Sequence, residues 1–108
     1  MKKNIIEVCA ASIQSAVIAQ NAGADRVELC GGLEIGGITP SAATILKTRA
    51  LLDIDIFVLV RPRGGDFCYS RLEMETIKED ILFCKNLPAN KAGKKIDGVV
   101  IGLSLIHI

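Results

Sequence analysis

The apolar residues of the chain fall into four short runs, and longer segments with helical signals lie between the runs. The runs are rich in β-branched and aliphatic side chains, as strands are, and they occupy residues 4–8, 26–30, 56–60 and 97–101. The intervening segments predict helices over residues 12–22, 41–52 and 70–87. Strands that alternate with helices in this order predict a parallel α/β sheet.

Each predicted helix follows a residue suited to capping. Ser12 precedes the first helix, either Thr39 or Ser41 precedes the second, and Ser70 precedes the third. Glu73 stands three residues after Ser70, which is the spacing of a capping box. These caps place the helix starts without any knowledge of the tertiary structure.

Two kinds of parallel fold fit this order of elements, a doubly wound sheet and a (β/α)8 barrel. Residues 10–12, after the first predicted strand, lack the glycine fingerprint of dinucleotide-binding doubly wound sheets. If Ile6, Val8, Val27 and Leu29 face the helices, the opposite face carries charged and thiol side chains. Barrel enzymes keep such side chains at the carboxyl ends of their strands. We therefore predict a (β/α)8 TIM barrel, of which four strands and three helices form a truncated portion.

The face opposite the helices is predicted to hold Glu7, Cys9, Arg26, Glu28 and Cys30. Buried charges are costly unless they are paired, so the two glutamates are expected to contact an arginine. The pairs could be purely structural, or the cluster could be a functional site. In the functional interpretation Glu7 and Glu28 transfer protons, and Arg26 joins an anion-binding group.

The third predicted strand leads directly into a loop with two arginines, two glycines and an aspartate. Arg61 and Arg63 point to the same side while the chain stays extended. Gly64 and Gly65 permit a tight turn, and Asp66 adds a carboxylate that could also transfer protons. This combination predicts an anion-binding site. The alternative is an arginine–aspartate ion pair that only holds the loop in place.

Composition excludes several classes of partner. The chain has 108 residues, half of them hydrophobic, and a net charge of +1, which predicts one domain with no nucleic-acid partner. No apolar run approaches the length of a membrane span, so no membrane partner is expected. The four cysteines form no Cys-x-x-Cys pair, which indicates reduced thiols and a cytoplasmic location.

Two of the cysteines could form a metal site. Cys9 and Cys30 end neighbouring parallel strands, whose backbones lie about 4.8 Å apart. Thiolates are the ligands that Cu(I) prefers, so the pair could bind this ion. The alternative is that both side chains are small buried hydrophobic groups and bind nothing.

Five motifs carry a resemblance to a known family: Glu7-Val-Cys9, residues 23–30 (Gly-Ala-Asp-Arg-Val-Glu-Leu-Cys), residues 36–41 (Gly-Gly-Ile-Thr-Pro-Ser), residues 60–70 (Val-Arg-Pro-Arg-Gly-Gly-Asp-Phe-Cys-Tyr-Ser) and residues 97–102 (Asp-Gly-Val-Val-Ile-Gly). With them the chain resembles the CutC family, whose members are called copper homeostasis proteins. The resemblance implies a cytoplasmic (β/α)8 barrel about twice this length, with residues 1–103 as its N-terminal half. Residues 104–108 depart from the family pattern. The resemblance also implies that Cys9 and Cys30 bind Cu(I).

Two functions follow as hypotheses. In the first, the protein binds or transports copper through Cys9 and Cys30. In the second, it is an enzyme that holds an anionic small molecule with Arg61 and Arg63 and needs neither cysteine. The expected partners are a copper ion and such an anion, and the complete protein is expected to be a homo-oligomer.

Overall fold

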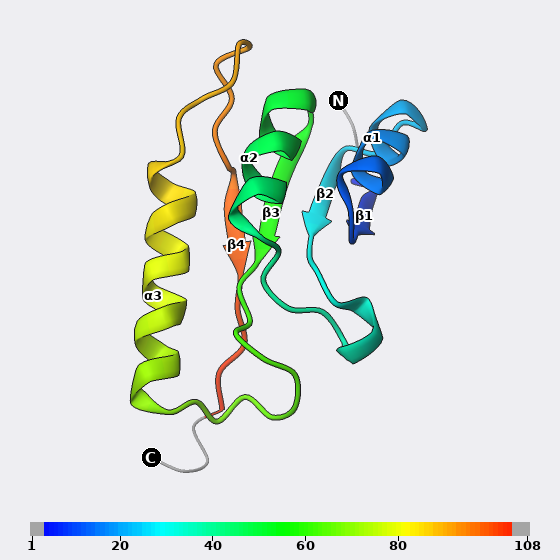
Figure 1. Cartoon of the computed structure of the whole chain (residues 1–108). Helices are drawn as coiled ribbons and strands as arrows, with labels where there is room; N and C mark the ends of the chain where they lie inside the picture. The colour runs from blue at the N-terminus through cyan, green and yellow to red at the C-terminus, as the bar shows by residue number, and fades with distance from the viewer. Residues whose placement is uncertain (1–3, 105–108) are drawn as a thin grey trace.

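A single parallel sheet with the strand order β1-β2-β3-β4 forms the centre of the molecule (Figure 1). The structure is a computed structural model that describes residues 4–104. Its elements are β1 (Glu7–Ala10), α1 (Ile13–Asn21), β2 (Arg26–Leu29), the short 3-10 helix η1 (Leu33–Ile35), α2 (Ala42–Leu51), β3 (Asp55–Leu59), α3 (Arg71–Asn86) and β4 (Gly98–Val100). The predicted α/β architecture of four parallel strands and three helices is confirmed.

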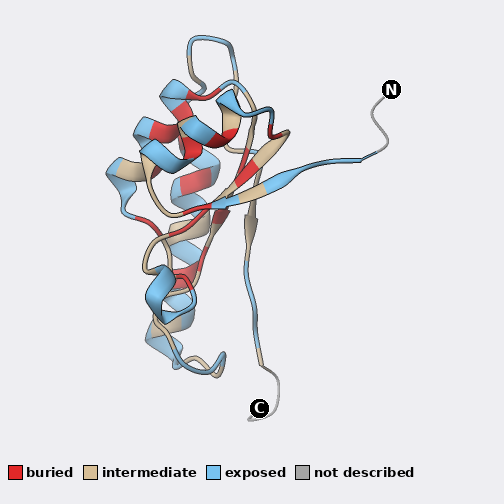
Figure 2. Cartoon of the chain, turned by 90° about the vertical axis from the view of Figure 1, so that its right-hand side faces the viewer, coloured by how far each residue is buried: buried red, intermediate tan, exposed pale blue. Residues whose placement is uncertain are grey.

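Helices α1, α2 and α3 cover one face of the sheet, and none of the elements within residues 4–104 covers the other (Figure 2). The covered face buries Val27 and Leu29 of β2 and Ile56 and Val58 of β3 completely. These side chains pack with small residues of α1 and with Ile45 of α2 to form the core. The uncovered face is therefore the one that the interior of a barrel would present.

The predicted helix starts are confirmed. The hydroxyls of Ser12, Ser41 and Ser70 each accept a hydrogen bond from a backbone N–H in the first turn. Ser70 and Glu73 form the complete capping box. Of the two candidates for α2, Ser41 is the cap, and Thr39 instead accepts a hydrogen bond from the backbone N–H of Arg61 at 2.8 Å. Thr39 thus holds the loop that follows β3.

The first strand begins three residues later than predicted. Glu7 pairs with Arg26, the first residue of β2, so the chain before Glu7 extends past the end of its neighbouring strand. Ile6 was expected to face the helices, but it is 57% exposed for this reason. The remaining strand ends lie within two residues of the predicted ones.

Arg49 holds the amino end of the sheet together from within the core. Its side chain is 1% exposed, and the guanidinium donates hydrogen bonds to the carbonyl oxygens of Leu52, Ile54 and Lys95 at 2.7–3.0 Å. It also pairs with the Asp97 carboxylate at 3.3 Å. Burial lowers the pKa of Arg49, while the Asp97 carboxylate opposes this shift. One side chain therefore ties α2 to the segments that enter β3 and β4.

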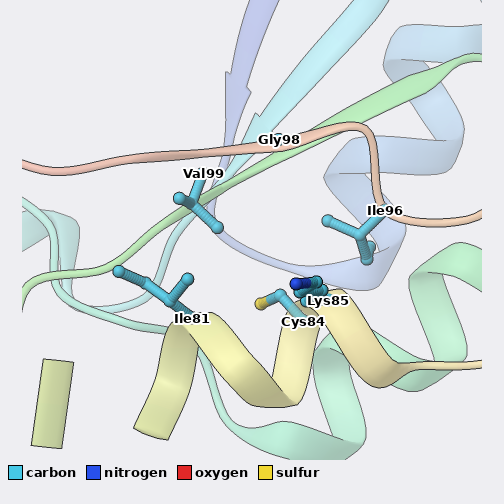
Figure 3. A pocket seen from close by; sticks show the side chains of 6 residues that line it. All are labelled: Ile81, Cys84, Lys85, Ile96, Gly98 and Val99. Atoms are coloured by element: carbon cyan, nitrogen blue, oxygen red, sulfur yellow. The ribbon is translucent and has the colours of Figure 1, made fainter. Parts of the chain in front are cut away.

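An apolar pocket of about 230 Å³ lies between α3 and β4 (Figure 3). It is lined by Ile81, Cys84, Lys85, Ile96, Gly98 and Val99. Burial raises the pKa of the Cys84 thiol to about 11.

None of the helices that the structure describes is both long and apolar enough to span a bilayer.

Candidate functional site

The uncovered face of the sheet brings three candidate side chains together. Cys9 of β1 lies opposite Glu28 of β2 in the parallel register, and Glu28 lies opposite Phe57 of β3. Cys30 follows β2 directly, and its backbone N–H donates to the carbonyl of Ala10 at 2.9 Å. Alternation along the strands therefore places the two cysteines and Glu28 on one face, as the sequence predicted.

The Sγ atoms of Cys9 and Cys30 are 3.5 Å apart. Both thiols are free; Cys9 is exposed and Cys30 is buried. Residues 31–37, which include four glycines, form the glycine-rich loop after β2. This loop lies over the two thiols, because a Cβ atom at Gly37 would come within 3.8 Å of the Cys30 Cβ and 3.0 Å of Leu59. Gly37 has a φ of +95°, so both its conformation and its contacts require glycine. The chain fold thus creates a two-sulphur pair beside a closely packed loop.

The thiol of Cys30 is difficult to ionise. Burial, the hydrogen bond with the Cys9 thiol, and the negative charges of Cys9 and Glu28 raise the pKa of Cys30 to about 12. At neutral pH the Cys30 proton therefore stays in place unless a cation replaces it.

The rate of alkylation should show directly that the Cys30 thiol is difficult to ionise. Because the pKa of Cys30 is raised to about 12, its thiol stays almost entirely protonated at pH 8, and the thiolate is the reactive form. We therefore expect iodoacetamide to modify Cys30, and also Cys84, at least about 100-fold more slowly than Cys68, as followed by peptide mass mapping. Similar rates at Cys30 and Cys68 would contradict the placement of Cys30. Unfolding in urea should make all four rates similar.

Arg61 fastens the glycine-rich loop to the end of β3. Its Nη1 donates to the carbonyls of Ile35 at 3.1 Å and Gly37 at 2.9 Å, and its Nη2 donates to the carbonyl of Gly65 at 2.8 Å. The guanidinium carbon lies 5.0 Å from the centre of the Phe67 ring, a cation–π contact. These contacts leave the side chain little freedom to move.

Arg63 ties the loop to α3. Its Nε and Nη2 meet the two carboxylate oxygens of Glu73 at 2.5 and 3.3 Å, and Nη2 lies 3.2 Å from the Asp66 carboxylate. The hydrogen bond from Arg63 lowers the pKa of Glu73, and the capping contact with Ser70 adds to this shift. Arg63 and Asp66 thus form the loop-holding ion pair that the sequence left open as an alternative. Gly64 and Gly65 form the turn between them, and the Gly64 carbonyl accepts a further bond from Arg63.

A cavity of about 440 Å³ opens at the carboxyl end of this face. It is lined by Glu28, Gly36, Leu59, Arg61, Phe67, Val100, Ile101 and Gly102. Burial raises the pKa of the Glu28 carboxyl, and the nearby Glu7 raises it further. The cavity is thus lined by both Arg61, a predicted anion-binding residue, and Glu28, a predicted proton-transfer residue. Arg63 and Asp66 do not line it.

Glu7 and Arg26 are the first residues of β1 and β2, and neither lines the cavity. Their side chains form an ion pair at 2.6 Å, and the Arg26 guanidinium stacks on the Phe57 ring. The expected pairing of Glu7 with an arginine is confirmed, whereas within residues 4–104 Glu28 has no ion-pair partner. The register explains the separation, because Glu7 and Arg26 begin their strands while Arg61 follows the end of β3.

The sequence did not identify the apolar walls of the cavity. The sequence patterns gave no reason to place Phe67 or Val100 at a binding site, although Phe67 lies in the same loop as both arginines. An aromatic residue a few positions after a candidate anion-binding arginine was the available signal.

The part of the chain that the structure describes holds no cluster of three or more histidine, cysteine, aspartate or glutamate side chains suited to a metal ion. The two sulphurs of Cys9 and Cys30 are therefore the metal-binding group to be considered there.

Comparisons with known proteins agree on one family. The sequence profile of the CutC family matches residues 4–107. The chain is 50% identical to a CutC family protein of Parabacteroides distasonis over 93% of its own length and 39% of that relative. It is 46% identical to the human copper homeostasis protein CutC homolog, covering 91% of this chain and 33% of the human one.

A solved structure is also similar. A crystal structure of CutC from Streptococcus agalactiae superposes with a TM-score of 0.79 at 35% sequence identity, over 92% of this chain and 45% of that one. The chain thus spans less than half the length of these relatives. The likeness supports the barrel-type arrangement of its strands and helices.

Proposed function

The chain belongs to the CutC family, and from this we propose that the protein acts in copper homeostasis by binding Cu(I) between Cys9 and Cys30. The observation that carries the proposal is the 3.5 Å separation of the two sulphur atoms. Cu(I) is a soft cation that prefers thiolates to carboxylates or imidazoles. A pair of thiols from neighbouring strands gives it two such ligands.

The separation of the sulphurs indicates how the ion would be held. With a metal–sulphur bond of about 2.3 Å, as in zinc thiolates, two sulphurs 3.5 Å apart subtend about 100° at the metal. A linear two-sulphur site would need them about 4.6 Å apart. The pair therefore suits a bent site that leaves room for a third ligand, such as a thiol of a copper donor or acceptor.

The Cys30 proton must leave when copper binds. Because the pKa of Cys30 is about 12, this proton is present throughout the neutral range. We therefore expect the apparent Cu(I) affinity to rise about tenfold per pH unit between pH 6 and 8 for this proton alone.

A competition titration tests the proposal. Cu(I) is added to the complete protein under reducing conditions together with a chromophoric Cu(I) chelator, at several pH values. We expect one copper ion per chain and the rise with pH. Binding that is independent of pH, or that persists equally in the urea-unfolded protein, would contradict a site at Cys9 and Cys30.

The proposal includes a cytoplasmic location and a homo-oligomeric complete protein. Reduced thiols persist in reducing compartments, and all four cysteines of the chain are free. Large apolar side chains are exposed on the helices, among them Ile18, Leu51 and Leu72, which supports further association of this surface.

A second candidate function is an enzyme that acts on a small molecule in the 440 Å³ cavity. The observation that favours it is that Glu28 and Arg61 line the same cavity. Among the three predicted proton-transfer residues, Glu28 is the strongest candidate, because Glu7 pairs with Arg26 and Asp66 pairs with Arg63. Such an enzyme would keep its activity when Cys9 and Cys30 are both changed to alanine, whereas a copper protein would lose its function.

A further inference from the structure

We propose that the cavity at the carboxyl end of the sheet binds a small organic acid, whose oxyanion is received by the Nε edge of Arg61 and whose carbon body lies against Phe67. Arg61 lines the cavity, and the structure holds it by three backbone carbonyls. The inference rests on the second candidate function for the choice of cavity. It concerns binding, and it requires neither catalysis nor copper.

Arg61 and Arg63 differ in whether the Nε edge of the guanidinium has a hydrogen-bond partner. In Arg63, the edge formed by Nε and Nη2 is occupied by the two oxygens of the Glu73 carboxylate. In Arg61, both donors on the Nη1 side are used and Nη2 makes one bond, while Nε is buried without a hydrogen-bond partner among the described residues. The edge that holds a carboxylate in Arg63 is thus unpaired in Arg61, but its Nε atom is covered, so a ligand that enters from the cavity must displace the atoms over it. Two parallel N–H bonds from this edge match the geometry of a carboxylate or phosphate.

A buried N–H without a partner destabilises the fold and calls for an explanation. Arg49 also has such an Nε atom, but its side chain lies inside the core with 1% exposure. Arg61 lies at an open cavity that a ligand can enter. An oxyanion that displaces the atoms over Nε would satisfy it, and the three carbonyls that hold Nη1 and Nη2 limit the conformational entropy that the side chain loses on binding.

The walls of the cavity indicate the rest of the ligand. Leu59, Val100 and Ile101 contribute apolar surface beside the Phe67 ring. Gly102 allows this ring to approach the strand end, because a Cβ atom there would lie 3.2 Å from it. Glu28 is the other charged side chain of the lining. A carboxyl group at that position disfavours a second anionic group and can accept a hydrogen bond from a hydroxyl or ammonium group. The class that fits is an acid with one oxyanion and an apolar body.

Benzoate and its neutral isostere benzamide test the proposal by calorimetry on the complete protein. We expect benzoate to bind and benzamide to bind at least about tenfold more weakly, because the charge-assisted pair is lost. Arg61→Lys should weaken benzoate at least about tenfold, since lysine keeps the charge without the planar edge. Arg63→Lys is the matched control, and it should change benzoate affinity less than about twofold, because its edge already holds Glu73.

Two further measurements test the proposal if the Arg61→Lys variant does not fold. Phe67→Leu leaves Arg61 intact and should weaken benzoate several-fold more than acetate. In nitrogen-15 spectra of the parent, benzoate should shift the Arg61 Nε–H signal and leave that of Arg63 in place. Equal binding of benzoate and benzamide, absence of benzoate binding at millimolar concentration, or equal losses from both Arg→Lys variants would overturn the proposal. Benzoate binding that survives Cys9→Ser would show that the cavity and the copper pair are independent.

Discussion

Replacing Arg49 by methionine is expected to lower the free energy of unfolding by about 3–5 kcal/mol, the range found when one partner of a buried ion pair is removed. The guanidinium satisfies three carbonyl oxygens and the Asp97 carboxylate. Methionine fills a similar volume but takes away the donor to the Ile54 and Lys95 carbonyls and the cation paired with Asp97. The Leu52 carbonyl keeps its hydrogen bond from Asn90, and the Asp97 carboxylate keeps that from the backbone N–H of Ile56. The segments that enter β3 and β4 should therefore loosen together.

Urea unfolding of the complete protein, followed by circular dichroism, measures this effect. Arg71→Met is the matched control, because Arg71 is exposed on α3 and its loss should change stability by less than about 0.5 kcal/mol. Arg49→Lys should fall between the two variants, since a lysine can reach some of the acceptors but not all of them at once. If Arg49→Met and Arg71→Met proved equally stable, Arg49 would not hold the amino end of the sheet.

The second large effect concerns copper. Changing either Cys9 or Cys30 to serine is expected to lower Cu(I) affinity by at least about 100-fold, because one thiolate and one hydroxyl make a poor site for a soft ion. The effect should be similar for the two positions, since the 3.5 Å pair is destroyed in both. The measurement is competition with a Cu(I) chelator under reducing conditions.

Cys68→Ser is the control for this series. Cys68 belongs to the loop that Arg63 ties to α3, where its carbonyl accepts a hydrogen bond from Arg63. Its thiol is not part of the sulphur pair, so copper affinity should stay within about twofold. Cys84→Ser should also spare the affinity, but it places a hydroxyl in the apolar pocket beside α3, so its stability must be measured in parallel. Equal losses from all four substitutions would indicate unspecific thiol binding.

The sequence by itself determined the architecture and the helix starts. Alternating strand and helix patterns predict a parallel sheet because βαβ units connect parallel strands, and the structure has four such strands. The capping box of Ser70 and Glu73 was predictable because its partners are three residues apart, so local geometry alone brings them together. The common face of Cys9 and Glu28 followed in the same way from strand alternation.

The tertiary structure decided which of the similar side chains share the candidate site. Arg61 and Arg63 are equivalent in the local pattern, but one lines the cavity while the other meets Glu73. Glu7 and Glu28 lie on one face, but Glu7 finds Arg26 across the strand pair. The register of neighbouring strands and the path of the loop after β3 set these contacts, and both depend on packing between residues far apart in sequence. Periodicity assigns a side chain to a face, whereas its partner depends on the whole fold.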